Sequence, residues 1–401
     1  MKKILLIGHG PKINPSSTNV AFPQLRTWSM ERYLHSLGHS VHTIYVEDKE
    51  MNIPNTGYDV AITAGPFASA YAALSLPDEI PLWLDWPSDP RADLHARVHS
   101  TGSIPNPSEQ AFVTMLHTLS LRRADAVGVI SKRQYWATLS CMLDWKIHDP
   151  NLHKKIFTVP ISFDFPFPSA EKPRTQKKNI ALAGSINSWF DAQTSFQLLN
   201  TVVHEHPQVN IHVFGGRVAH HVNPTCPLQT WSHNQVHHHG WLSNNDFYTS
   251  LCGQDIGFWM NRQGVEPLLG SRTRALLFAW MGMDITASCD TELMTNLLSE
   301  ELVWDIRTAD DLRNALISPS QHGKKLKEYC SDTYAPSTVY APIEKWLCAP
   351  KRYTQPNADN VSDEIYRLRQ TILAIHNSAT WTWGSRIHRF FQKIVRRDNN
   401  V

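Results

Sequence analysis

The sequence has no long hydrophobic run, no closely paired cysteines and no excess of charge of one sign. Without a stretch of about 18 apolar residues, nothing in it is expected to span a membrane. Its six cysteines are widely separated, which argues against a disulfide framework or a zinc site and favours reduced thiols in the cytoplasm. Lys and Arg number 38 against 36 Asp and Glu, so we expect no nucleic-acid partner.

What is present is the composition of an ordinary globular protein, with 42% hydrophobic and 18% charged residues. A length of 401 residues predicts two domains and a tail rather than one core. The charge is unevenly distributed. Residues 351–401 contain nine Lys or Arg and four Asp or Glu, a net +5, which leaves −3 for the rest of a chain whose total is +2. This asymmetry indicates an interaction role for the tail.

Two halves of the chain repeat the order of apolar strand, glycine turn and helix. The first starts with an apolar run at 4–7, too short for a signal peptide, that ends in Gly8-His9-Gly10. The second starts at 179–183 and ends in Gly184-Ser185. Alternation of strands and helices predicts two parallel, Rossmann-like sheets. Further strands are expected at 41–46, 60–64, 82–84, 124–130, 156–159, 209–214, 256–259 and 284–287, and helices at 22–37, 107–121, 190–204 and 271–281.

The domain organisation follows from this repeat. The expected fold class is α/β, with two Rossmann-like domains facing across a cleft and a C-terminal helical tail. The predicted parts are an N-terminal domain over 1–165, a Pro-rich linker over 166–178, a C-terminal domain over 179–336, a segment returning to the N-terminal domain over 337–350, and the tail over 351–401.

The two glycine turns are candidates for phosphate binding, because such a turn lets backbone N–H groups approach a phosphate at a helix N-terminus. Neither has the Gly-x-Gly-x-x-Gly pattern, so dinucleotide binding is not expected. A tight turn without a ligand is the alternative for each.

A stronger pattern is Glu266 followed by Arg272-Thr273-Arg274 at the start of a predicted helix. A carboxylate here can accept hydrogen bonds from sugar or ribose hydroxyls. The arginines can add charge to helix amides that point at a diphosphate. Two arginines at a helix start oppose the helix dipole, which favours an anionic ligand. The alternative is that both are solvated surface charges.

In the N-terminal half, Asp85 and Asp89 follow a predicted strand, where side chains of an α/β sheet face the crevice. Asp85 is a candidate to orient or deprotonate an acceptor hydroxyl, and capping of the next turn is its alternative role. His9 and the loop 10–19 lie at the end of the first strand. The Pro, Ser, Thr and Asn content of that loop suits a segment that closes over substrate.

These motifs resemble glycosyltransferase family 4 (glycosyl transferases group 1), and especially a bacterial subgroup with a Glu-x5-Arg-Thr-Arg motif. Matches run in order from about residue 1 to 352 and include the turn ending in Trp189-Phe190-Asp191 and the segments 84–90 and 124–136. The resemblance implies a GT-B fold, a nucleotide-diphosphate sugar as co-substrate, retention of configuration and no bound metal or other cofactor. It implies donor binding by Gly184, Ser185, Trp189, Glu266, Arg272, Thr273 and Arg274, acceptor contacts from Gly10 and Asp89, and catalytic roles for Asp85 and His9.

One position departs from the family, since the usual second acidic residue, which holds the ribose, falls on Leu277. Two alternatives therefore stay open. A non-catalytic GT-B partner subunit would use the cleft as a binding surface. A GT-B sugar-nucleotide epimerase would need a paired acid and base, for which Asp85 with His9 is the only candidate.

Histidines cluster at 220–221 and 237–239. Adjacent residues on a strand point to opposite faces, and no carboxylate or cysteine pair lies at ligand spacing. We therefore expect a polar loop before Gly240 and no metal site.

The tail contains two apolar patterns. An apolar seam over 361–375 predicts a helix that packs on the N-terminal domain or pairs with a second copy. Residues 381–397 form a basic amphipathic pattern, typical of a segment that binds an anionic membrane surface or of a helix packed on the protein body. With the family resemblance, this predicts a cytoplasmic enzyme of surface polysaccharide or glycolipid assembly, with a glycan or lipid-linked acceptor at the inner face of the plasma membrane. Its oligomeric state stays open.

Overall fold

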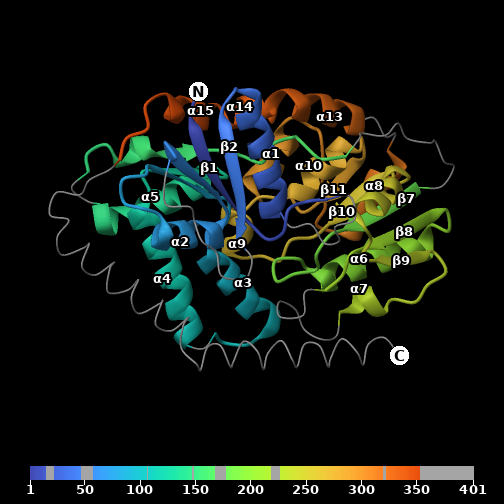
Figure 1. The fold of residues 1–401 in the computed structure, drawn as a ribbon. Coiled ribbons are helices and arrows are strands. Elements are labelled where there is room, and N and C mark those ends of the chain that lie inside the picture. Colours follow the sequence, from blue (N-terminus) through green and yellow to red (C-terminus); the bar gives the residue numbers. More distant parts are fainter. Residues whose placement is uncertain are drawn as a thin grey trace, which may run out of the picture. The chain divides into compact units, whose positions relative to one another are not determined.

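The apolar runs predicted to be buried strands form two parallel sheets, which confirms the α/β fold class (Figure 1). The computed structural model of the chain describes residues 1–14, 22–46, 57–105, 107–146, 149–167, 178–217, 226–318 and 322–352. Each sheet has six strands, in the orders β2-β1-β3-β4-β5-β6 and β12-β11-β10-β7-β8-β9.

The first sheet and its helices come from the N-terminal half. Its strands are β1 (Lys3–His9), β2 (Ser40–Val46), β3 (Val60–Ala64), β4 (Leu82–Trp86), β5 (Ala126–Val129) and β6 (Ile156–Thr158). Its helices are α1 (Phe22–Ser36), α2 (Pro66–Ser75), α3 (Pro90–Thr101), α4 (Pro107–Arg123), α5 (Lys132–Lys146) and the 3-10 turn η1 (Leu152–Lys155).

The second sheet restarts the pattern. Its strands are β7 (Lys178–Ala183), β8 (Val209–Phe214), β9 (Val236–Gly240), β10 (Ile256–Trp259), β11 (Asp284–Ala287) and β12 (Trp304–Asp305). Its helices are α6 (Ala192–Glu205), α7 (Pro227–Thr230), α8 (Asn244–Cys252), α9 (Val265–Leu269), α10 (Thr273–Trp280), α11 (Glu292–Ser299), α12 (Ala309–Ile317) and α13 (His322–Thr333).

Burial explains why the central strands were recognisable. Every residue of β3, β4, β5, β10 and β11 is buried, because helices cover both faces of a parallel sheet. Most of these strands therefore appear in the sequence as short apolar runs, although β11 contains Asp284 and Thr286.

The strands at the edge of the second sheet were not predicted. The expectation of a polar loop over 237–239 was wrong, because Val236–Gly240 pairs in parallel with β8 as the edge strand β9. The two-residue strand β12 was also missed. The residues of β9 are exposed or half-buried and include three histidines, so this strand carries no buried apolar pattern. Its strand conformation comes from backbone pairing with its neighbour.

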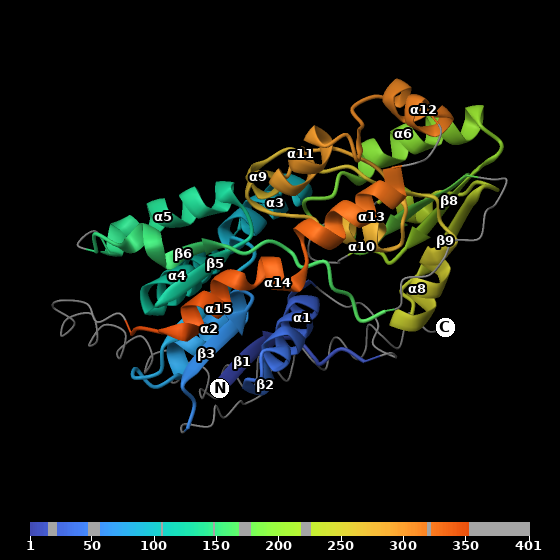
Figure 2. The same cartoon turned by 90° about the horizontal axis from the view of Figure 1, so that it is seen from above.

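After α13 the chain returns to the first sheet through α14 (Pro336–Val339) and α15 (Ala341–Cys348), which Figure 2 shows beside α1. The Tyr33 hydroxyl on α1 donates to Glu344 Oε2 at 2.9 Å. The rings of Trp83 and Trp346 lie 5.5 Å apart. The predicted helices at 361–375 and 381–397 lie outside the described residues. Within the described part of the chain, every helix is too short or too polar to cross a bilayer.

Candidate functional site

Each sheet has a point where the strand order reverses, between β1 and β3 in the first and between β7 and β10 in the second. Ligands of such sheets bind outside the carboxyl ends of the strands at this point. Gly184 follows the end of β7, and the segment from Glu266 to Arg274 follows β10. The fold therefore brings the two predicted donor motifs to the same edge of the second sheet.

Glu266 and Arg272 form a buried ion pair with each other. The Arg272 Nη1 and Nη2 donate to Glu266 Oε1 and Oε2 at 2.9 and 2.6 Å. Arg272 Nε donates to Asn261 Oδ1 at 2.7 Å, and Asn261 Nδ2 donates to the Ser288 carbonyl at 3.2 Å. The Glu266 carboxylate is thereby fixed in orientation at the end of a polar chain.

This pairing corrects the expectation that Arg272 is available to a diphosphate. Its charge is compensated by Glu266, and Nη1 also donates to the Ser271 carbonyl at 3.1 Å. Arg272 is the N-cap residue of α10, so it stands at the helix start as predicted, but its guanidinium turns back to α9. It acts as the residue that positions Glu266.

Arg274 connects the two motifs. Its Nη2 donates to the Ser185 carbonyl at 3.1 Å, next to Gly184, whose φ of +96° is accessible mainly to glycine. Burial and then the neighbouring charge of Arg272 lower the pKa of Arg274 to about 9, so it stays protonated at neutral pH. Within the described residues Arg274 has no carboxylate in salt-bridge contact. Among the described residues, this edge of the sheet therefore carries a positive charge that no carboxylate contacts.

The turn after Gly184 is held by a second arginine that the sequence motifs did not single out. Arg262 Nε donates to the Ser188 carbonyl at 3.2 Å, and its backbone N donates to Trp189 O at 2.7 Å. The Trp189 ring is half-buried, with the Arg272 guanidinium 6.0 Å from its centroid. Thr273 is the first residue of α10 and is half-buried. The only signal for Arg262 in the sequence was its place three residues after the end of β10.

In the first sheet, Asp85 on β4 is fully buried in an ion pair with Arg26 of α1. Arg26 Nε and Nη2 donate to its two oxygens at 2.5 and 2.7 Å, and Nη2 also donates to the Val159 carbonyl at 2.8 Å. Burial works against the charge of Arg26, but the contacts with Asp85 raise the Arg26 pKa above its ordinary value. The expectation that Asp85 faces the crevice was wrong, because Arg26 covers it.

Asp89 is the residue that caps the following helix, the role considered for Asp85. It is the N-cap of α3 and accepts from Arg91 N at 2.9 Å and from Arg91 Nη2 at 2.6 Å. Burial opposes its charge, but the hydrogen bonds and charge of Arg91 lower the Asp89 pKa below its ordinary value. Asp89 therefore has a structural role besides any contact with an acceptor.

His9 and Gly10 lie at the carboxyl end of β1. The His9 ring stacks on Phe67 of α2 with centroids 5.2 Å apart, and Phe67 is 52% exposed. Gly10 has a φ of +78° and donates to the Val46 carbonyl at 3.0 Å. Asp85 is thus engaged by Arg26 and the His9 ring lies against Phe67, which gives no support to an acid–base pair of His9 and Asp85.

Asp93 is a half-buried acid that sequence analysis missed. It lies in the first turn of α3, which packs on α9, the helix that carries Glu266. Burial, followed by the charges of Glu266 and Asp89, raises the Asp93 pKa to about 8, against smaller opposing effects of Arg272 and Arg97. No hydrogen bond or ion pair reaches its carboxylate from the described residues. Perturbed acids of this kind concentrate at functional sites.

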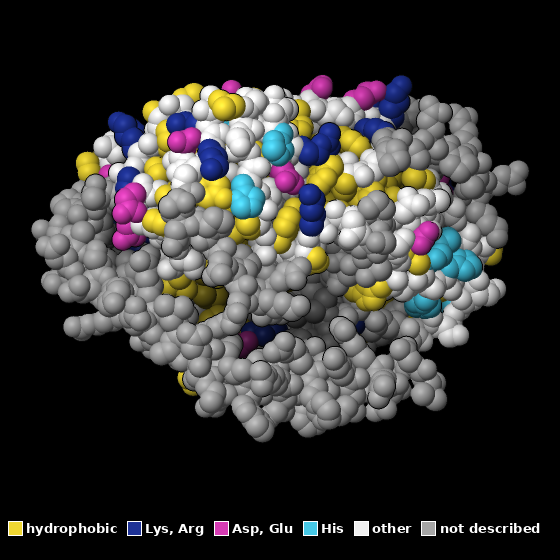
Figure 3. Space-filling view, in the orientation of Figure 1, with side chains coloured by type: hydrophobic (Ala, Val, Ile, Leu, Met, Phe, Trp, Pro, Cys, Tyr) yellow, Lys and Arg dark blue, Asp and Glu magenta, His cyan; other side chains and the backbone are white. Residues whose placement is uncertain are grey.

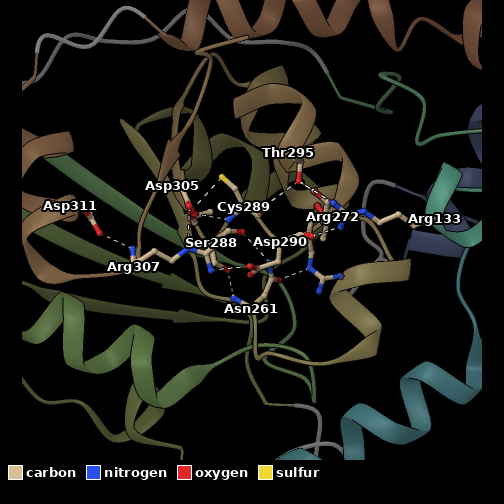
Figure 4. Close-up of polar contacts among 12 residues, drawn as sticks. Arg133, Asn261, Arg272, Ser288, Cys289, Asp290, Thr295, Asp305, Arg307 and Asp311 are labelled. Carbon is tan, nitrogen blue, oxygen red and sulfur yellow. Dashed lines mark hydrogen bonds and ion pairs between the residues drawn. The ribbon is translucent and has the colours of Figure 1, made fainter. Parts of the chain in front are cut away.

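The two halves also meet at α5 and α11. The backbone N–H groups of Lys132 and Arg133 donate to the Glu292 carboxylate at 2.9 and 3.0 Å, so an acid of the second half satisfies the N-terminus of a helix of the first. Arg133 Nη1 donates to the Asp290 carbonyl at 2.7 Å (Figure 4).

Figure 3 shows histidine side chains on the surface over β8 and β9. His212 Nδ1 lies 3.0 Å from His239 Nε2, and the ring of His237 is 4.9 Å from that of His212. Burial, followed by His237 and His239, lowers the His212 pKa to about 4. No group of three or more potential ligands in the described segments is arranged to hold a metal ion. Independence from metal stays a prediction.

No protein-family model and no curated protein matches the sequence. Among solved structures, a trehalose-phosphate synthase (UDP-forming) from Burkholderia vietnamiensis is similar with a TM-score of 0.56 and 10% identity, over 87% of this chain and all of that one. Anabaena Alr3699/HepE, in complex with UDP and glucose, is similar with a TM-score of 0.54 and 14% identity, over 87% and 100%.

TarM is similar with a TM-score of 0.50 and 11% identity over 72% of this chain, which spans about half of TarM, 54% of its length. At these identities the likeness concerns the fold. Together with the two parallel sheets, it shows that the chain has the GT-B fold.

Proposed function

We propose that the chain transfers a sugar from a nucleotide-diphosphate sugar to a hydroxyl acceptor, with retention of configuration. The observation that carries the proposal is the convergence of Arg274, the Gly184-Ser185 turn and Glu266 at the carboxyl ends of β7 and β10. A diphosphate would supply the negative charge that Arg274 lacks among the described residues, and backbone amides at the start of α10 favour the same anion.

The fold supports a nucleotide sugar as the ligand, because HepE has this fold and its structure contains UDP and glucose. In the proposed reaction the acceptor oxygen bonds to the anomeric carbon of the sugar. The bond from that carbon to the diphosphate breaks on the same face of the sugar, and the departing diphosphate takes both the electron pair of that bond and the proton of the acceptor hydroxyl. Arg274 stabilises the departing charge, and Glu266, held by Arg272, accepts hydrogen bonds from sugar hydroxyls. His9 and Gly10 would contact the acceptor.

The test is incubation of the full-length protein with a panel of nucleotide sugars, with release of free nucleoside diphosphate as the measurement. Arg274→Ala should lose at least about tenfold in release, since a hydrogen bond to a charged group contributes about 1.5–3 kcal/mol. Arg313→Ala is the matched control, because Arg313 forms an exposed ion pair with Glu205. Activity that Arg274→Ala leaves unchanged would remove this edge as the donor site.

A second candidate is a non-catalytic subunit that binds a nucleotide sugar without turning it over. Leu277, at the position of the family's second acid, is a core residue of α10 and is 9% exposed. No side chain there can hold a ribose. Nucleotide-sugar binding by calorimetry, with no diphosphate release from any donor, would favour this candidate over the enzyme. The epimerase alternative loses its one acid–base pair, because Asp85 is bound by Arg26.

We also propose that the transfer needs no divalent metal. The positive charge of Arg274 at the predicted leaving group supports this. Full activity should survive EDTA. Activity that is lost in EDTA and restored by one particular metal would contradict the proposal.

The setting we propose is surface polysaccharide or glycolipid assembly on the cytoplasmic side of a membrane, with 381–397 as the membrane-binding segment. Five basic residues lie in this segment, and each contributes about 1 kcal/mol near an anionic surface. The full-length protein should sediment with anionic but not neutral vesicles, detach in high salt, and lose binding when truncated after Ser378. Unchanged sedimentation with a lower melting temperature after truncation would show a structural tail instead.

A further inference from the structure

Three neighbouring strands of the second sheet end in glycine with a positive φ. Gly184 after β7, Gly215 after β8 and Gly240 at the end of β9 have φ values of +96°, +86° and +64°. Gly215 N donates to Gly240 O at 2.6 Å, and a Cβ on Gly215 would lie only 2.5 Å from Gly184 O. The three turns thus form a continuous floor of backbone across the carboxyl ends of the strands. No side chain fits at its centre.

An aromatic side chain lies on this floor. Trp241 follows Gly240, and its Cζ3 is 3.3 Å from the place where a Cβ on Gly215 would stand. Its Nε1 is 3.2 Å from the corresponding place on Gly216, so both rings of the indole border the space that side chains at Gly215 and Gly216 would fill. Trp241 is nevertheless 41% exposed. A large aromatic ring that is supported from below and open to solvent can stack with a planar ligand.

The surroundings of Trp241 favour a ligand that is planar and polar at once. The amide Nε2 of Gln229, on the exposed part of α7, is 3.3 Å from the same Cβ position on Gly216. It places hydrogen-bonding groups at the edge of the indole. At the other end of the floor, two strands away, Arg274 and the Gly184 turn carry the uncompensated positive charge. Two strand spacings are about 9.6 Å, the scale of one nucleoside between base and diphosphate.

We propose that Trp241 is the platform on which the nucleobase of the donor stacks, so that the nucleotide lies across the carboxyl ends of β9, β8 and β7 with its diphosphate at Arg274. The inference rests on the proposed function, since it assigns the base end of the same ligand. It explains why Gly215 and Gly216 have no side chains, because larger residues would displace the indole or the neighbouring backbone.

Calorimetry with two probes tests the platform. UDP, GDP, ADP and CDP report on the whole nucleotide site, and inorganic pyrophosphate reports on the diphosphate end alone. Trp241→Ala should weaken the best nucleoside diphosphate about tenfold to a hundredfold, the usual loss when a base–aromatic stack is removed. Pyrophosphate binding should stay unchanged. Trp241→Phe should restore most of the affinity. Trp136→Ala, which removes a 66% exposed tryptophan of α5, should have no effect.

The possible outcomes separate the two proposals. Wild-type affinity for nucleoside diphosphates in Trp241→Ala, with Arg274→Ala weakened for both probes, overturns the platform and leaves the donor site in place. Loss of both probes in Trp241→Ala shows a structural role for the indole and also overturns the platform. A wild-type protein that binds pyrophosphate as tightly as any nucleoside diphosphate has no base subsite. A wild-type protein that binds neither probe overturns the proposed function together with this inference.

Discussion

The carboxyl edges of the two sheets have similar charged residues but differ in how those charges are balanced. At the edge of the first sheet, Asp85 is paired with Arg26 and Asp89 with Arg91. At the edge of the second, Glu266 is paired with Arg272, but Arg274 has no acidic partner among the described residues. Buried charges that are paired with each other stabilise the fold. A charge left uncompensated beside a floor of glycines marks a place for a ligand of opposite charge.

The same comparison of paired and unpaired charges applies to Asp93. Asp93 is a half-buried acid of the first half with no hydrogen bond or ion pair to its carboxylate from the described residues, and it lies on the helix that packs on α9. Among the described residues, the first half thus contributes an acid without a partner, Asp93, and the second an arginine without a carboxylate partner, Arg274.

The largest expected effect comes from breaking the pair in the first sheet. Arg26→Ala should lower the free energy of unfolding by about 3–5 kcal/mol, because it leaves the Asp85 charge buried without a partner. Urea unfolding of Arg26→Ala, Asp85→Leu and the double variant measures this. The double variant should recover much of the loss. A stable Asp85→Asn variant that has lost activity would instead support a catalytic role for Asp85.

The pair in the second sheet should behave similarly, with a slightly smaller effect. Arg272→Ala should destabilise the fold by about 3 kcal/mol and leave the Glu266 carboxylate without a fixed orientation. Arg274→Ala should leave the melting temperature near that of the wild type, since Arg274 forms no ion pair with the described residues. Equal loss of stability in both variants would contradict the distinction between positioning and ligand-binding arginines.

The third prediction concerns pH. The Asp93 pKa is raised from 3.8 to about 8, so between these pH values the unfolded chain has released a proton that the folded protein keeps. Folding stability contributed by this group therefore falls as the pH rises from 4 to 8. Asp93→Asn should be more stable than the wild type, on the order of 2 kcal/mol at pH 8 once partial exposure is allowed for, and about equal at pH 4.

Melting temperatures of both proteins across this pH range give the measurement. Asp93→Asn should also change the pH profile of activity if the acid contacts the acceptor. A stability difference that does not vary with pH would show that Asp93 has an ordinary pKa and a partner elsewhere.

The smallest expected effect is the stability lost when a glycine at the edge of each sheet is replaced by alanine. Gly10→Ala should cost about 1–2 kcal/mol, the strain of a left-handed residue, because its nearest neighbour is the flexible Gln24 side chain at 3.3 Å. Gly215→Ala should cost more, since its Cβ would meet the Gly184 carbonyl at 2.5 Å. Thermal unfolding of the two variants compares them. An equal loss of stability in both variants would indicate that the backbone around Gly215 adjusts readily to an added Cβ.

Much of this fold was predictable from local patterns. The strands β1, β3, β7 and β10 were evident because largely apolar runs follow from burial on both faces. The positions of the glycine turns were evident for the same reason, since each closes such a run. The edge strands β9 and β12 were not, because β9 is mostly histidine and β12 has only two residues, whereas the edge strand β2 has enough apolar residues to be recognised.

The sequence by itself determined which residue types gather at the carboxyl ends of the strands, namely glycines, the acids and the arginines after β10. Only the tertiary structure decided which of these charges remain uncompensated. Asp85 meets an arginine 59 positions away, and Arg274 meets the Ser185 turn 89 positions away. Such partners are chosen by the packing of helices on sheets, which short motifs do not encode. An ion pair depends on the distance between two groups in space, and spacing along the chain constrains that distance only within one helix or turn.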